Sequence, residues 1–574
     1  MKRIFAGGVK MKFSDYTYER PNYEEYKRNF NILLDRFTNA TTYEECDKAL
    51  EEINILRGSL MTMMELSSIR YTINTNDEFY SKEKDYWDEN SPLYEELDDR
   101  YNKAMVASKF REELERKYGK QLFKLLELKL KTFSKDIIED LQVENKLTSE
   151  YVKLIASAKI PFNGEILNLP GLGKYKESTD RDIRKAAWEA TSKFFEDNEE
   201  AFDSIYDKLV KVRTKIAKKL GYTSFVELGY VRMSRTDYNA EMVSKFRKQV
   251  KEYIVPVASK LYERQRQRLG LDKLKYYDID IEFISGNATP KGDKNWILSN
   301  GEKMYSELSD ETKEFFNFMV DRNLLDLETK EGKAGGGYCT YINDYKSPFI
   351  FSNFNGTSGD IDVLTHEAGH AFQVYNSTWI TIPEIVWPTY ESCEIHSMSM
   401  EFLTWPWMNN FFLEDADKYK FTHLGSAIKF IPYGVTVDEF QHFVYENPEA
   451  TPMERKNMWR QLEKKYLPHK DYEGDDFLER GGFWFKQSHI FENPFYYIDY
   501  TLAQLCALQF WKKANENREV AWSDYLTLCK AGGTMSFLDL VKLANLKSPF
   551  KEGCVNSIIG DIENWLDNVN DKIL

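Results

Sequence analysis

The stretch Val363-Leu364-Thr365-His366-Glu367-Ala368-Gly369-His370-Ala371-Phe372 contains two histidines four positions apart, with a glutamate directly after the first. On a helix, positions i and i+4 lie on one face, so both imidazoles can reach one metal ion. The pattern is typical of a zinc site in which the glutamate acts as general base. We therefore predict that His366 and His370 bind one zinc ion and that Glu367 accepts a proton beside it.

The residues around this pattern favour a helix with one buried side. Apolar residues recur at helical spacing, which places them along one stripe of the helix surface; they are Ile361, Leu364, Ala368, Ala371 and Tyr375. The opposite side of the helix would then face a site. The alternative is that the histidines and the glutamate are hydrogen-bonded core residues of a buried helix.

Histidine is confined to one part of the chain. All seven histidines fall between positions 366 and 489, and none occurs in the first 365 residues. Imidazole is a common metal ligand and titrates near neutral pH, so this clustering marks the region where chemistry is expected. We interpret His423, His442 and His469 as ordinary structural residues.

A catalytic zinc ion needs a third protein ligand and an open position. One known arrangement requires glycine at position 373 and histidine at 376, but this chain has Gln373 and Asn376. The other arrangement uses a glutamate on a following helix, and the next segment offers Glu391, Glu394 and Glu401. Spacing alone does not separate Glu391 from Glu394.

Composition limits the class of protein. The chain of 574 residues is 42% hydrophobic and 30% charged, as expected for a large globular protein. Its net charge of −15 argues against a nucleic-acid partner. The six cysteines are widely spaced, which is typical of free thiols in a reducing compartment. No apolar run long enough for a membrane span or a secretory signal occurs, so we predict a cytoplasmic protein without a membrane partner.

The first half of the chain is expected to be almost entirely helical. Between about residues 20 and 260, apolar residues recur at helical spacing among charged ones, and no strand pattern is present. Hydroxyl and acidic residues at 41–45 and 179–182 form capping patterns that begin helices. Prolines and glycines predict a loop at 160–175. A second methionine, Met11, leaves open whether residues 1–10 are native.

The segment just before the histidine motif predicts β-structure. After the glycines at 335–337, the runs Tyr338–Ile342 and Pro348–Phe354 are rich in aromatic and β-branched residues and are separated by a turn. We expect two strands of a small sheet beside the zinc helix. The edge of such a sheet can bind an extended peptide through main-chain hydrogen bonds.

The order of these motifs resembles the thimet oligopeptidase and oligoendopeptidase F family of zinc metallopeptidases, and more closely its bacterial Pz-peptidase-like branch. In that family a Glu-x-x-Ser segment follows the second histidine by about 24 residues, with another acid seven positions on. Glu394, Ser397 and Glu401 match this pattern. The resemblance implies that Glu394 is the third zinc ligand, with Glu391 as its rival, and that Glu401 orients a histidine ligand.

Further downstream, members of the family carry a histidine followed by tyrosines, and this chain has His489, Tyr496, Tyr497 and Tyr500. The resemblance implies that such residues hold the substrate carbonyl, where a hydrogen-bond donor stabilises the developing oxyanion. Pro494 suits the first turn of a helix, which would place Tyr497 and Tyr500 on one face. We predict His489 and Tyr500, and then Tyr497, as catalytic donors, and Tyr496 as a core residue on another face.

The resemblance implies a mainly α protein of the zincin, gluzincin type: a large helical, two-lobed body with a deep substrate channel and a small β-sheet beside the zinc helix. We expect a helical N-terminal region at 1–200 and a catalytic region at 201–574. The expected function is a zinc-dependent endopeptidase with one zinc ion per chain. It would hydrolyse internal bonds of short unfolded oligopeptides, using a zinc-activated water with Glu367 as general base.

Two other functions are compatible with the motif. A peptide-binding or scaffolding protein could retain a structural metal, although structural zinc sites usually have four ligands and favour cysteine. A carboxypeptidase of the same zinc class would need a cationic anchor for the C-terminal carboxylate, and Arg480 is a candidate. The sequence leaves open the native metal, since cobalt or manganese suits the same ligands, as well as the cleavage preference and the oligomeric state.

Overall fold

Helices make up most of the described chain, which comprises residues 11–574 of a computed structural model. The predicted mainly α class is confirmed. The question about residues 1–10 concerns a segment outside these described residues. Within the described part, no helix combines the length and the apolar character that crossing a membrane requires.

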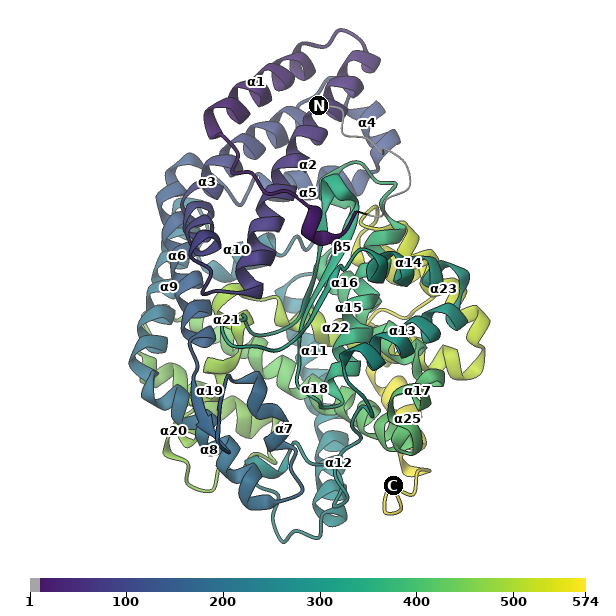
Figure 1. The fold of residues 1–574 in the computed structure, drawn as a ribbon. Coiled ribbons are helices and arrows are strands. Elements are labelled where there is room, and N and C mark those ends of the chain that lie inside the picture. Colours follow the sequence, from purple (N-terminus) through teal and green to yellow (C-terminus); the bar gives the residue numbers. More distant parts are fainter. Residues whose placement is uncertain (1–10) are drawn as a thin grey trace.

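A first group of helices begins the chain, and α1 to α5 lie together at one end of the molecule (Figure 1). The capping pattern at 41–45 starts a helix as predicted, because the Thr42 hydroxyl accepts a hydrogen bond from the Glu45 backbone amide at 3.2 Å. The helices are α1 (Tyr23–Asn39), α2 (Tyr43–Ile73), α3 (Glu78–Val106), α4 (Arg111–Tyr118), α5 (Lys120–Lys129) and α6 (Ile138–Ala156).

A short antiparallel hairpin follows, within the stretch expected to be only a loop. Its strands are β1 (Ile160–Phe162) and β2 (Glu165–Leu167). Asn163 and Gly164 join them with φ angles of 50° and 81°, and Asn-Gly is the sequence that favours such a two-residue turn. The dipeptide was therefore the signal that the sequence interpretation missed.

The next helices continue the predicted helical region. Asp180, rather than Thr179, caps α8, since its carboxylate accepts from the backbone amides of Asp182 and Ile183. The helices are α7 (Gly173–Lys176), α8 (Arg181–Asp197), α9 (Glu199–Lys219), α10 (Phe225–Arg232), α11 (Ala240–Gln249), α12 (Val255–Arg268), α13 (Lys294–Leu308) and α14 (Asp310–Asp321).

A three-stranded sheet then precedes the histidine motif. The two predicted strands are confirmed as β4 (Tyr338–Ile342) and β5 (Ser347–Phe354), which pair antiparallel with Tyr338 opposite Phe351. A third strand, β3 (Leu325–Glu328), was not predicted and pairs parallel with β5. The strand order is β3-β5-β4, so β4 is an edge strand.

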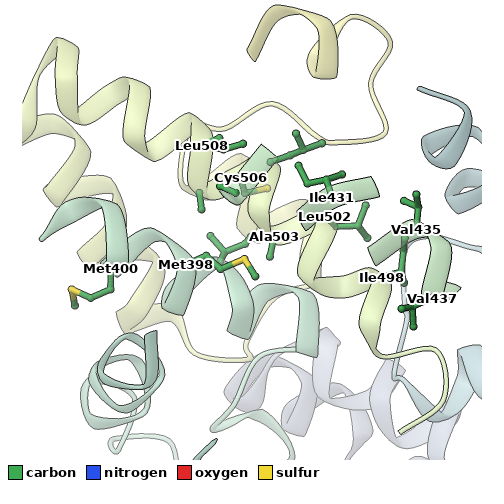
Figure 2. Close-up of a cluster of buried hydrophobic side chains, with 14 of the residues drawn as sticks. Met398, Met400, Ile431, Val435, Val437, Ile498, Leu502, Ala503, Cys506 and Leu508 are labelled. Atoms are coloured by element: carbon green, nitrogen blue, oxygen red, sulfur yellow. The ribbon is translucent and has the colours of Figure 1, made fainter. Parts of the chain in front are cut away.

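The remaining helices form the centre and the C-terminal side of the molecule. The histidine motif lies on α15, which packs against α16, and α16 in turn packs against α22. Figure 2 shows apolar side chains of α16, α18 and α22 meeting in this core. The helices are α15 (Gly359–Asn376), α16 (Tyr390–Leu403), α17 (Asn409–Phe412), α18 (Ala416–Glu446), α19 (Pro452–Tyr466), α20 (Asp476–Glu479), α21 (Ser488–Glu492), α22 (Tyr497–Glu516), α23 (Arg518–Ala531), α24 (Phe537–Leu543) and α25 (Cys554–Asp567).

Two large hydrophobic clusters hold these elements together. One joins α1 to α5 with the segment that connects α15 to α16, through residues such as Ile382 and Ile385. The other includes Leu66 of α2 and Tyr151 of α6 and extends to α25. Helices on both sides of residue 200 thus contribute to the second cluster, and the division at residue 200 stays a prediction.

The contact between α15 and α16 depends on a glycine. A Cβ atom at Gly369 would lie 2.6 Å from Ser397 Cα and 2.7 Å from the His396 carbonyl oxygen. Both neighbours are backbone atoms of α16, which cannot move aside without shifting the helix. The missing side chain therefore allows α16 to approach the histidine-bearing helix closely.

We expect Gly369→Ala to destabilise the protein by about 1–3 kcal/mol, because the added methyl group overpacks this helix contact. The measurement is the midpoint of thermal or urea unfolding. Gly425→Ala on α18 is the matched control, since a Cβ there meets nothing within 4 Å, and we expect it to be neutral or stabilising by up to about 1 kcal/mol. Equal midpoints for the two variants would contradict the role given to Gly369.

Candidate metal centre and catalytic pocket

Three predicted ligands converge in the structure. His366 and His370 extend from α15 and Glu394 extends from α16, and their ligand atoms all lie within 4.8 Å of one another. Glu394 Oε2 lies 3.2 Å from His366 Nε2 and 3.4 Å from His370 Nε2. Two imidazoles and one carboxylate form a typical set for a catalytic zinc ion.

The rival glutamate lies elsewhere. Glu391, one turn before Glu394 on α16, accepts a hydrogen bond from the Thr389 hydroxyl at 2.7 Å. Burial, with a contribution from Asp499, raises the pKa of Glu391 to about 8. A carboxyl group that holds its proton near neutral pH is a poor metal ligand. The position of Glu391 and its raised pKa therefore both favour Glu394 as the third ligand.

A hydrogen-bond network holds the Nδ1 side of the His366 ring. Trp405 Nε1 donates to His423 Nδ1 at 3.1 Å, so the hydrogen of His423 is on Nε2, which donates to Glu401 at 2.7 Å. The other oxygen of Glu401 lies 2.7 Å from His366 Nδ1. Because a carboxylate accepts, His366 carries its hydrogen on Nδ1 and leaves the Nε2 lone pair for a metal.

His423 was expected to be an ordinary structural residue, and the structure instead places it in this network. It lies on α18 at position 423, and no local pattern links that position to the histidine motif. Only the packing of α18 against the centre brings it to Glu401. Glu401 takes the position behind His366 that the family resemblance implied.

The electrostatics of the centre suit a cation. Burial lowers the pKa of His366, but the carboxylates of Glu394 and Glu401 outweigh this effect and hold it well above its usual value. Burial also raises the pKa of Glu367. Among the described residues, Glu367 Oε2 is buried without a hydrogen-bond partner. An orphaned carboxylate oxygen beside a three-ligand set fits a zinc ion with a water molecule between them.

These groups face a pocket of about 670 Å³. Its walls come from both halves of the chain. The residues that line it include Leu125 and Lys129 of α5, Gly337 to Thr340 around the start of β4, the three candidate ligands, Glu367, and Ser488, His489, Glu492, Asn493, Tyr496 and Tyr500 around α21 and α22. A second cavity of about 530 Å³ shares Lys129, Ser234, Tyr390 and Glu492 with it. The two cavities therefore adjoin, and together they are called the cleft below.

The structure brings two of the predicted donors into the pocket. His489 Nε2 and the Tyr500 hydroxyl lie 2.9 Å apart, and both residues line the pocket. Tyr497 does not line it, because its ring packs against Phe430 and Tyr433 at centroid distances of 5.8 and 5.7 Å. Burial lowers the pKa of His489 to about 4, so its imidazole is neutral near pH 7.

The expected position of Tyr496 in the core is wrong. Tyr496 lines the pocket, and its hydroxyl donates a hydrogen bond to Glu394 Oε1. The error came from the start of the helix, since α22 begins at Tyr497 and not near Pro494. Phe495 adopts a φ of 70° and forms a turn. Tyr496 therefore precedes the helix and does not follow its face pattern.

Arg480, the candidate anchor for a C-terminal carboxylate, is not brought to the pocket. Its guanidinium donates to Glu199 Oε2 at 2.8 Å, and it is not one of the residues that line the pocket. Cys393 does line the pocket, and its thiol donates to the Pro388 carbonyl at 3.4 Å.

Comparisons with known proteins find similarity to one family of peptidases. The model of peptidase family M3 matches residues 174–558, and the model of the peptidase M3 N-terminal domain matches residues 13–133. An oligoendopeptidase F homolog of Borreliella burgdorferi is 22% identical over 444 residues, which cover 72% of this chain and 72% of the relative. The chromosomal oligoendopeptidase F of Lactococcus lactis subsp. cremoris is 22% identical over 424 residues, 68% of this chain and 65% of the relative.

A solved structure of Pz peptidase A with an inhibitor is similar along the whole chain. It is 62% identical, has a TM-score of 0.97, and the match covers 98% of this chain and 100% of that chain. The mainly α architecture and its small sheets are therefore shared with a solved peptidase structure.

We expect Glu401→Gln to lower the affinity for zinc by about 10–100-fold, because the second hydrogen-bond partner of a metal-binding histidine sets its orientation and basicity. The measurement is a competitive titration against a fluorescent zinc chelator. Glu391→Gln, another buried glutamate of α16, is the matched control and should keep the wild-type affinity. Wild-type affinity in Glu401→Gln, or an equal loss in both variants, would contradict the role given to Glu401.

Proposed function

The chain belongs to peptidase family M3 and is a metallo-endopeptidase, and we propose that it depends on zinc and cleaves internal bonds of short, unfolded oligopeptides. The resemblance to oligoendopeptidase F and Pz peptidase is confirmed by these matches. The observation that carries the proposal is the convergence of His366, His370 and Glu394 beside the orphaned carboxylate of Glu367.

Zinc would be held by His366 Nε2, His370 Nε2 and Glu394 Oε2, one ion per chain. When bound, zinc supplies Lewis-acid activation of a water molecule and of the scissile carbonyl. Glu394 keeps one oxygen for the Tyr496 hydroxyl, and its other oxygen also accepts from the Ser397 hydroxyl at 3.0 Å. These contacts orient the carboxylate before a metal binds.

Glu367 is the proposed general base. Its side chain follows His366 on α15 and lines the pocket beside the ligand set. Burial raises the pKa of its carboxyl group, which brings its basicity closer to that needed near neutral pH. Glu367 would accept a proton from the attacking water and then deliver it to the leaving amine.

The peptide would lie along the edge strand β4. Tyr338, Cys339 and Thr340 of this strand line the pocket, and an edge strand offers free main-chain groups to an extended segment. A Cβ atom at Gly337 would lie 3.3 Å from Glu367 Oε1, so the glycine keeps the space beside the base open. Tyr500 and His489, on the opposite wall, would stabilise negative charge on the substrate carbonyl oxygen.

The test of the proposed function is mass spectrometry of a mixed oligopeptide pool after incubation with the zinc-loaded protein, with and without a chelator. Internal cuts that disappear with the chelator and return with zinc support the proposal, and parallel additions of cobalt and manganese identify the preferred metal. No cleavage by a zinc-loaded sample would favour the peptide-binding alternative.

A comparison of three substrates separates endopeptidase from carboxypeptidase action and tests whether the cleft excludes folded proteins. We expect a ten-residue peptide and its C-terminally amidated form to be cut internally at similar rates, whereas an intact folded protein should resist. Adjoining cavities of about 670 and 530 Å³ would hold an extended peptide but not a folded domain. Cleavage that stops when the C-terminus is amidated would instead indicate a carboxypeptidase.

We expect Glu367→Gln to reduce kcat by about 10²–10⁴-fold, the usual contribution of general acid–base catalysis. The metal content of the variant should remain that of the wild type, because Glu367 is not a proposed ligand. The measurement combines peptide turnover with metal analysis, and Glu414→Gln at an exposed position is the control. Near-normal turnover of the Glu367 variant would exclude this glutamate as the base.

A further inference from the structure

A chain of four hydrogen-bonded side chains leads from α18 to the catalytic pocket. The Tyr433 hydroxyl donates to Gln487 Oε1 at 2.8 Å. Gln487 Nε2 lies 2.9 Å from His489 Nδ1, and His489 Nε2 lies 2.9 Å from the Tyr500 hydroxyl. Neither Gln487 nor Tyr433 has a role in the proposed mechanism.

The donor and acceptor roles in this chain follow from the placement of the Gln487 amide, whose oxygen faces Tyr433 and whose nitrogen faces His489. An amide oxygen only accepts, so the hydroxyl of Tyr433 must donate to Gln487 Oε1. The amide nitrogen of Gln487 then faces His489 and only donates. His489 Nδ1 must therefore accept, which leaves the single hydrogen of the neutral imidazole on Nε2.

This tautomer determines what Tyr500 can do. His489 Nε2 donates to the Tyr500 oxygen, so the Tyr500 hydroxyl does not donate its own hydrogen to the imidazole. Tyr500 lines the pocket, where that hydrogen can reach a bound carbonyl. The neighbouring phenol of Tyr496 already donates to Glu394. With the other tautomer, Tyr500 would donate to His489 and lose its role as a donor to the substrate.

The surroundings keep His489 neutral. Its ring is enclosed by Tyr496, Tyr497 and Tyr500, with centroid distances of 5.1–5.5 Å. Burial lowers the pKa of His489, and Glu394 on α16 is the charged group that opposes this effect. A neutral imidazole has only one hydrogen to place, so the contact at Nδ1 controls the contact at Nε2.

We propose that Gln487, oriented by Tyr433, is a positioning residue that fixes the hydrogen of His489 on Nε2 and so directs the hydroxyl hydrogen of Tyr500 to the scissile carbonyl. The proposal rests on the proposed function, which it deepens by separating the roles of the two predicted donors. Tyr500 contacts the substrate, and His489 acts through Tyr500.

Gln487→Glu is the decisive variant. A carboxylate at this position only accepts, so His489 Nδ1 must carry a hydrogen. When the imidazole of the variant is neutral, Nε2 becomes an acceptor and takes the hydrogen of Tyr500. When it is protonated at lower pH, both nitrogens carry hydrogens and Tyr500 is free again. We therefore expect the ratio of variant to wild-type kcat to fall as pH rises, with little change in KM.

At the high-pH limit the loss should approach that of Tyr500→Phe, about 10²–10³-fold, which is the usual effect of removing one oxyanion donor. Adding Gln487→Glu to Tyr500→Phe should cause no further loss, because both changes remove the same hydrogen bond. Gln461→Glu, the same charge change at an exposed position, should leave kcat unchanged. A ratio that does not vary with pH, or full additivity of the two losses, would overturn the proposal.

A second measurement does not depend on turnover. Nitrogen-15 NMR of histidine-labelled wild-type protein, with the signal assigned by a His489→Gln variant, should show His489 as the neutral tautomer with hydrogen on Nε2. Hydrogen on Nδ1 would overturn the proposal even in an active enzyme. Failure of the proposed function would appear differently, as the absence of peptide cleavage with an unchanged tautomer.

Discussion

The close contact between α15 and α16 is the constraint on which the centre of this protein depends. Two histidines on one helix can supply only part of a catalytic metal site, and the third ligand must arrive from another element at a fixed distance. Gly369 removes the side chain that would separate the helices. Glu394 then lies within 3.4 Å of both imidazoles. The rest of the site is arranged around this junction.

Successive layers of hydrogen bonds surround the junction, and each is supplied by a helix packed behind it. Glu401 of α16 accepts from His366 and is itself held by His423 of α18, and Tyr496, just before α22, donates to Glu394. Within residues 11–574, Oε2 of Glu367 is buried beside the candidate ligands without a hydrogen-bond partner. If these residues act as proposed, the candidate ligands are held in place and the proposed base is free, so the reacting groups need little rearrangement.

The local parts of this arrangement could be predicted from the sequence. Helical spacing predicted the helix around His366, and aromatic runs predicted β4 and β5, because these patterns report on which side of an element is buried. The sequence interpretation failed at two turns, each of which changed where the neighbouring element begins or ends. The turn at Phe495 moved Tyr496 out of the expected helix and into the pocket, and the Asn-Gly turn of the β1–β2 hairpin was overlooked.

The sequence by itself determined which chemistry to expect, since the types and local spacing of His366, Glu367 and His370 restrict what a helix can bind. The family resemblance predicted Glu394 as the third ligand of the proposed set. Only the tertiary structure decided that His423 supports the ligands and that Gln487 faces His489. Such contacts join helices distant along the chain, and their distances depend on how whole helices pack. No periodicity within a single element records that packing.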